Sequence, residues 1–272
     1  MEISLQFFEQ TCPTAKSPTG DIYNMVVPFF ERQERLIRTV IGSTLFDSLS
    51  LTGETNKELA SVVARFVCVS AFHEAIPHLD LVLTQTGFGV VSNDTIAPAS
   101  MERVRNLREG LLLDAAAAFD DMIDILPSVP DWSDTGYARR MFSALFISAK
   151  DIADIVDKPR TLDTVAHHLP EIRAEEEAIA SLLSPELMQH LRRGRRFNDL
   201  SDMELQLISR IKDHFVLRFR KSPEAKRNAS NLLKFVEDNI DAFPSYAASR
   251  TYEANHFERY ENKADDPCFI WG

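Results

Sequence analysis

The chain has 272 residues, of which 44% are apolar and 26% charged, a balance typical of a folded protein and not of a disordered or collagen-like one. Its 30 basic and 41 acidic side chains give a formal net charge of −11, which argues against a chain that wraps nucleic acid by counterion release. Three scattered cysteines without a CxxC pair favour a reducing compartment over a disulfide framework or zinc site. Neither a leader segment nor a membrane-spanning run is expected.

From Asp21 onward, apolar residues recur every three or four positions, which predicts a mainly helical chain. A first helical segment is expected over Asp21–Leu49, with Pro28 marking a kink or a helix start. A second helix should begin near Thr55 or Asn56 and stop before Pro77. Because this second helix is apolar on nearly every side, we expect it in the core.

The one clearly non-helical stretch is Leu79–Ala97, where short apolar runs are separated by glycines and turn residues. This pattern predicts a β-hairpin inserted between helices. Leu81, Phe88 and Val90 are its candidate contact residues, or else they cover the first bundle. A third helix should follow over 100–126, with a serine at its start as the N-cap.

The second half of the chain predicts five further helices and a tail. The helices are expected over 135–156, 171–183, 185–191, 201–221 and 225–243. Ser201 and Glu204 have the three-residue offset of a capping box. The last residues, Glu253–Gly272, are expected to form an extended tail.

An internal similarity links the two halves. Pro28–Leu49 aligns without a gap on Pro170–Leu191 at a shift of 142 residues, with five identities in 22 positions. Either the chain contains a duplicated unit, or the match is the scattered similarity of any two amphipathic helices. The duplication predicts a mainly α fold of two related helical bundle units, with one small β-hairpin insertion in the first and an extended C-terminal tail. The expected boundaries are 1–130 with the hairpin at about 79–97, 131–252, and 253–272.

Familiar catalytic and metal-binding patterns are missing from the sequence. His73 and His78 are five positions apart with Pro77 between them, whereas a zinc-protease helix needs a spacing of four. The pair His167-His168 is expected in a surface loop. Acidic groups at 114–124 and 175–177 are typical of solvated helix faces. No catalytic, cofactor-binding or metal-binding residue is therefore predicted, and no enzyme.

Four arginines around Gly194 form the sharpest charge feature: Arg192, Arg193, Arg195 and Arg196. They are expected in a loop between two helices. Their guanidinium groups could bind phosphates or an acidic protein surface, or they could form local salt bridges in a solvated loop.

The tail contains more aromatic residues than a chain terminus usually does. Its apolar end is Phe269, Ile270 and Trp271. Such side chains are expected to be buried, so the tail either folds back on its own bundle or anchors a neighbouring subunit.

The motif AIPHLDLVLTQTGFGVVSN at 75–93, with APAS at 97–100, resembles an uncharacterised family encoded by phages and prophages of gut anaerobes. The ending YENKADDPCF at 260–269 is also similar to that family. The family has no assigned activity, so no catalytic residue is carried over. The resemblance implies a virion structural role, similar to the head-completion or head–tail connector proteins of tailed phages.

The leading expectation is thus a non-enzymatic phage structural protein that works by oligomeric assembly. It would form a ring, contact the portal or neighbouring head and tail proteins, and lie near DNA without sequence-specific binding. No membrane, cofactor or small-molecule substrate is expected, and the location would be the host cytoplasm and then the virion. The alternative is a phosphate- or nucleic-acid-binding helical module that uses the Arg192–Arg196 segment. A third hypothesis, an enzyme with carboxylates from separate helices, has the least support.

Overall fold

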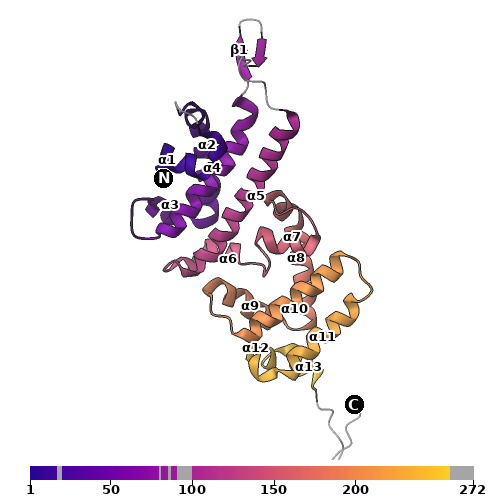
Figure 1. The fold of residues 1–272 in the computed structure, drawn as a ribbon. Helices are drawn as coiled ribbons and strands as arrows, with labels where there is room; N and C mark the ends of the chain where they lie inside the picture. Colours follow the sequence, from indigo (N-terminus) through magenta and orange to yellow (C-terminus); the bar gives the residue numbers. More distant parts are fainter. Residues whose placement is uncertain (17–19, 80, 85–86, 91–99, 258–272) are drawn as a thin grey trace, which may run out of the picture.

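The computed structural model describes residues 1–16, 20–79, 81–84, 87–90 and 100–257, without the side chains of 81–84 and 87–90. Figure 1 shows an elongated molecule in which the helices of the first half lie at one end and those of the second half at the other. Two clusters of buried apolar side chains correspond to these two ends. The mainly α character predicted from the sequence is confirmed.

The first half is built around one long core helix. Its helices are α1 (Leu5–Thr11), α2 (Asp21–Ile41), α3 (Ser43–Ser48), α4 (Lys57–Leu79) and α5 (Met101–Ile125), with a 3₁₀ turn η1 (Pro13–Ala15). α4 packs along both α2 and α5. As expected from its apolar pattern, α4 contributes many buried residues to the first cluster. By length and composition α4 could also cross a membrane, but 72% of its most apolar window is buried inside the protein, as in the core helix of a globular fold.

The second half is also helical, and its helices range from four to 21 residues. They are α6 (Gly136–Met141), α7 (Ala149–Val156), α8 (Leu162–Leu182), α9 (Pro185–Phe197), α10 (Asp202–Phe219), α11 (Ala225–Asp238), α12 (Pro244–Ala247) and α13 (Arg250–Asn255). Three 3₁₀ turns complete the order: η2 (Leu126–Ser128), η3 (Trp132–Asp134) and η4 (Ile240–Ala242). α8 joins the two ends, because Leu162 and Leu169 pack on the first cluster whereas Ile172 and Ile179 belong to the second.

Two predicted helix starts are confirmed by their caps. The Ser100 hydroxyl accepts a hydrogen bond from the Arg103 N–H at the start of α5. At α10, the Glu204 N–H donates to the Ser201 hydroxyl, and the Ser201 N–H donates to the Glu204 carboxylate at 2.7 Å. This is the reciprocal capping box that the sequence indicated.

The predicted β-hairpin insertion over Leu79–Ala97 is corrected. α4 continues through Pro77 to Leu79, because a proline in the last turn of a helix removes only one backbone hydrogen bond. Beyond it the backbone is assigned as two four-residue strands, β1 (Leu81–Thr84) and β2 (Gly87–Val90), which pair antiparallel. Residues 80, 85–86 and 91–99 lie outside the described chain. The predicted bounds are therefore wrong, because Leu79 belongs to α4 and the described strands cover only 81–84 and 87–90, and the fold class is mainly α.

The helix predicted over 135–156 is also wrong. α6 ends at Met141 and α7 begins at Ala149, and the intervening segment 142–148 is not helical. Its apolar residues Ala144, Leu145, Phe146 and Ile147 are all buried. An apolar run of this kind is typical of a buried helix, but here side chains from other helices form hydrogen bonds with the backbone N–H and C=O groups, as described below.

The two halves differ in packing. Pro28 and Pro170 both lie inside helices of 21 residues, α2 and α8, so Pro28 does not mark a helix start. However, α10 packs mainly against α7 and α11, whereas α4 packs along α2 and α5. The α10–α11 pair thus corresponds to the α4–α5 pair, whereas α7 and not α8 takes the place that α2 has beside α4. The tail predicted over 253–272 is not extended at its start, since α13 includes residues 253–255, and residues 258–272 lie outside the described chain.

Candidate functional site

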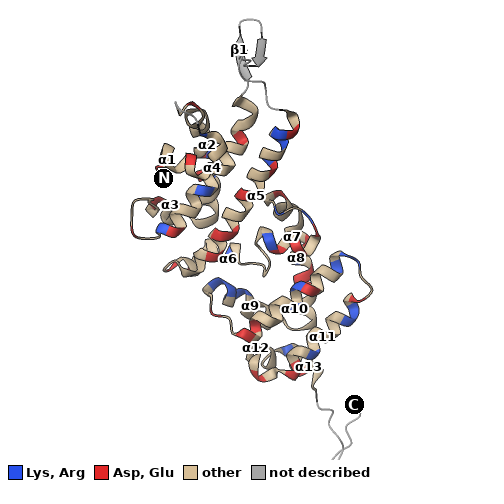
Figure 2. Cartoon of the chain, viewed as in Figure 1, with Lys and Arg blue, Asp and Glu red and all other residues tan. Residues whose placement is uncertain are grey.

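The arginine segment lies in a helix and not in the predicted loop. Arg192, Arg193, Arg195 and Arg196 occupy the last two turns of α9. Gly194 lies in the predicted loop, but the structure places it buried in α9, where a Cβ would overlap the Leu200 side chain. Glycine therefore allows close packing here and does not break the helix. Figure 2 shows blue stretches of the ribbon, which mark Lys and Arg, on α9 and at the beginning of α5.

Two of the four arginines hold the buried non-helical segment in place. Arg192 donates from Nε and Nη2 to Glu176 Oε2 at 3.1 and 2.9 Å. Glu176 is fully buried, and its Oε1 accepts the N–H groups of Leu145 at 2.7 Å and Phe146 at 3.3 Å. Arg195 Nη1 donates to the Leu145 carbonyl at 2.5 Å. Arg192 and Arg195 are thus committed to the fold.

Burial raises the pKa of Glu176, and the charge of Arg192 together with the Leu145 and Phe146 N–H bonds opposes that rise. In a helix, backbone carbonyl groups would accept the hydrogen bonds of the Leu145 and Phe146 N–H groups, and here the Glu176 carboxylate accepts them instead. Without it, two buried N–H groups would have no acceptor, a loss that protein interiors rarely tolerate.

The other two arginines form a basic cluster with α6. The guanidinium groups of Arg193 and Arg196 lie 5.0 and 4.9 Å from the centre of the Phe197 ring. Burial, Arg139 and Arg193 lower the pKa of Arg196, and Asp134 opposes them. The buried Nε of Arg196 has no hydrogen-bond partner. Arg139 could not be predicted from the sequence, because only the fold brings its charge close enough to act on Arg196.

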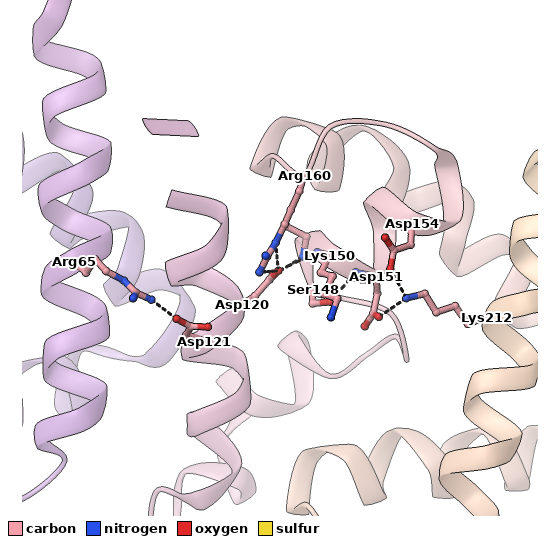
Figure 3. A network of polar contacts seen from close by, with 10 residues as sticks. Arg65, Asp120, Asp121, Ser148, Lys150, Asp151, Asp154, Arg160 and Lys212 are labelled. Atoms are coloured by element: carbon pink, nitrogen blue, oxygen red, sulfur yellow. Dashed lines mark hydrogen bonds and ion pairs between the residues drawn. The ribbon is translucent and has the colours of Figure 1, made fainter. Parts of the chain in front are cut away.

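Consecutive aspartates of α5 point to opposite neighbours, as Figure 3 shows. Asp121 pairs with Arg65 of α4. Asp120 is buried and accepts the N–H groups of Ala149 at 2.6 Å and Lys150 at 2.9 Å, at the start of α7. Asp120 therefore caps another helix, and it is not part of a solvated acidic face as the sequence suggested.

The same junction contains two further ionic contacts. Arg160 Nη2 lies 2.7 Å from Asp120 Oδ2. On the far side of α7, Lys212 of α10 donates to Asp151 at 2.9 Å and to Asp154 at 2.8 Å (Figure 3). Burial alone would raise the pKa of Asp151, but the Lys212 and Ser148 bonds and the Arg195 charge lower it overall. These carboxylates are held by cations and backbone groups and connect α5, α7 and α10.

The histidines of the sequence motifs lie in different surroundings. His73 lines a cavity of about 460 Å³ beside Glu74, Arg108 and Asp163. His78 stacks on Phe29, and His167-His168, predicted in a loop, lie within α8. Among the residues that the structure describes, no group of three or more His, Cys, Asp or Glu is placed to hold a metal ion.

The apolar residues predicted to make contacts lie outside the part of the chain that the structure describes in full. This applies to the side chains of Leu81, Phe88 and Val90 and to all atoms of Phe269, Ile270 and Trp271. Next to these two segments, however, stand the two most exposed large apolar side chains of the described chain: Met101 at 85% and Phe257 at 77%. Met101 begins α5 and Phe257 follows α13, and these two points lie at opposite ends of the molecule (Figure 1). Sequence inspection missed Met101, because exposure at a helix start has no local signature.

Comparison with known proteins identifies a family without an assigned role. Residues 32–141 match the model of a family of unknown function, DUF6712. This stretch runs from within α2 to the end of α6, which is less than half of the chain. No curated protein and no solved structure matches the chain.

Proposed function

We propose that this chain is a non-enzymatic structural subunit of a tailed-phage particle, a head–tail connector or head-completion protein that works by oligomeric assembly. The motifs at 75–100 and 260–269, which resemble a phage-encoded family, support this class of protein. The family whose model matches residues 32–141 has no known function, so this match indicates no activity.

One structural observation carries the assembly mode: exposed apolar side chains stand at opposite ends of an elongated molecule. Met101 and Phe257 are each more than three-quarters exposed, and both adjoin segments with further apolar residues in their sequence. A contact between two different ends is heterologous, and repeated contacts of this kind form a ring when the rotation closes. Two copies related by such a contact would place Phe257 of one near Met101 of the next.

The test is the mass of the chain in solution over a wide concentration range, combined with imaging of particles. The wild-type chain should associate, and Met101→Glu and Phe257→Glu should each weaken association at least tenfold. A mixture of the two variants should form pairs, because each variant retains one intact end.

Leu205→Glu is the matched control, because Leu205 is also a large apolar side chain, is 51% exposed, and lies on α10 and not at either end. It should associate like the wild type. A wild-type chain that remains monomeric at every concentration and is absent from particles would overturn the proposal.

A second candidate function rests on the basic cluster of Arg139, Arg193 and Arg196. Three guanidinium groups near one another, one with an unpartnered buried Nε, favour a bound anion such as a phosphate. DNA binding should then weaken with salt and fall at least tenfold in Arg193→Ala/Arg196→Ala. Arg227→Ala, an exposed site on α11, is the control. Equal binding by all three proteins would exclude this function.

A further inference from the structure

A groove of about 570 Å³ opens on the first half, where the end of α2, α3 and the turn before α6 meet. Its floor is formed by the buried side chains Ile41, Val129 and Trp132. Its rim combines the apolar groups of Leu45, Pro130 and Tyr137 with the hydroxyls of Ser43, Thr44, Ser48, Thr55 and Thr135. Grooves of roughly 300–1,000 Å³ lined mainly by apolar groups are typical of binding sites.

The walls of this groove are fixed before anything binds. The indole N–H of Trp132 donates to the Ile41 carbonyl at 3.0 Å, which anchors the ring to the end of α2. Gly42 has φ +95°, and a Cβ there would lie 2.9 Å from Tyr137 Cε2. The tyrosine ring therefore rests directly against a glycine backbone, which only glycine permits. A preformed groove loses little ordering entropy on binding.

We propose that this groove receives Phe269, Ile270 and Trp271 from a second copy of the chain. The inference rests on the proposed head-to-tail assembly and names the surface that accepts the tail. The apolar floor matches the chemistry of the three side chains, and the hydroxyl rim matches the backbone of an extended segment.

The start of the tail points to a neighbour as the donor. Phe257, the last described residue, is 77% exposed and so does not pack on its own molecule. Aromatic anchors in pockets provide most of the binding energy of typical interfaces. The segment that follows Phe257 carries such anchors, and the first half carries such a pocket.

The lengths of the two parts also agree. The 15 residues 258–272 span at most roughly 50 Å when extended. α5 has 25 residues and is therefore about 37 Å long, and it leads from Met101 to the chain segment of the groove floor. A copy whose Phe257 contacts the Met101 end of its neighbour could lay its tail along α5 and reach the groove.

The first experiment measures the groove directly. A fluorescent peptide of residues 258–272 is titrated into the full chain carrying Trp271→Ala, which removes competition from the resident anchor. Binding should be seen by anisotropy and should weaken at least tenfold when Ser48→Arg is added. Ser48 is exposed on the rim, and its hydroxyl donates only to the Leu45 carbonyl, so the change should not disturb folding.

Ser181→Arg is the matched control, because Ser181 is also exposed on a helix and donates to the carbonyl of the preceding turn. It should leave peptide binding unchanged. Equal binding to the Ser48→Arg and Ser181→Arg proteins would overturn the groove as the acceptor.

The second experiment separates this inference from the proposed function. Full chains with Ser48→Arg or Trp271→Ala should each fail to assemble, and their mixture should form pairs. If the wild type assembles and Ser48→Arg assembles equally well, the groove inference fails and the proposed function stands. If the peptide binds but the wild type is monomeric, the tail occupies its own groove, and both the intersubunit contact and the assembly proposal fail.

Discussion

Glu176 is the side chain on which the buried segment 142–148 depends. Its carboxylate accepts hydrogen bonds from two backbone N–H groups and from Arg192. Glu176→Ala should reduce the free energy of unfolding by about 3 kcal/mol, since it leaves buried donors and one charge without an acceptor. Urea unfolding measures this loss.

Glu177 provides the comparison, because it pairs with the same Arg192 Nη2 at 3.1 Å but is 70% exposed. Glu177→Ala should cost less than about 1 kcal/mol, as exposed ion pairs do. Similar losses for the two variants would show that the buried acceptor is not what stabilises the segment.

The two described cysteines are shielded from reagents. Burial, with a smaller effect of Asp114, raises the pKa of the Cys12 thiol to about 12, and burial also raises that of Cys68. In a Cys268→Ser background neither thiol should react with an alkylating agent at pH 8 until the chain unfolds. Mass spectrometry would detect the label, and rapid modification of the folded chain would contradict the burial.

Two histidines, the half-buried His73 and the buried His214, give the stability a definite pH dependence. Burial lowers the pKa of His73, with a further contribution from Arg108, and burial likewise lowers the pKa of His214. Below about pH 6.5 the unfolded chain therefore binds more protons than the folded chain, and the free energy of unfolding falls as the pH drops from 7 to 5.

His73→Gln/His214→Gln should flatten this slope, whereas His167→Gln, at an exposed site, should leave it unchanged. Thermal or urea unfolding at several pH values provides the measurement. An identical slope in the double variant would mean that other groups control this pH range.

Helix α7 depends on a side chain from another helix. Asp120 of α5 accepts its first N–H groups at Ala149 and Lys150, and the negative charge is favourable at a helix N-terminus. Asp120→Ala should lower the free energy of unfolding by about 2–3 kcal/mol, because it removes the acceptor of two N–H groups that the N-cap Ser148 does not satisfy and leaves Arg160 without its carboxylate.

Asp121→Ala is a matched control one position away. The exposed pair of Asp121 with Arg65 should contribute less than about 1 kcal/mol. Chemical denaturation of both variants tests the difference, and equal effects would refute the capping role of Asp120.

Local patterns in the sequence predicted the helices that local forces determine. Caps and periodicity act within a few residues and can therefore be read from the sequence. They predicted the starts of α10 and α5, through Ser201 with Glu204 and through Ser100, and the burial of α4, which is apolar on nearly every side. The segment 142–148 was mistaken for helix because its backbone is satisfied by Glu176 and Arg195, which are distant in sequence. A pattern within a few residues cannot predict hydrogen bonds to side chains so far away in the sequence.

The same limit explains the mistake about the arginines. A run of four basic residues around a glycine is usually a solvated loop, and only the fold shows Gly194 packed on Leu200. Arg192 and Arg195 then prove structural, whereas Arg193 and Arg196 form a basic cluster with Arg139. The candidate site is therefore smaller than predicted, and one of its members was missed.

The described part of the chain is elongated, with exposed apolar groups at its two ends (Figure 1). In a monomer the Met101 and Phe257 side chains are exposed to water, and contact with a neighbouring copy would bury them. Such surfaces are favoured sites of association. The polarity of the chain, with the groove in the first half and the tail after the second, gives any resulting assembly a direction.

The position of Trp132 in the groove floor offers an optical readout of occupancy. The chain has only two tryptophans, and the other is Trp271. Trp132 is 3% exposed, so its emission should already be that of a dry indole. In the wild-type chain the Trp132 emission should therefore stay constant, so that a blue shift with rising protein concentration would come from Trp271 and would follow its docking without any added label.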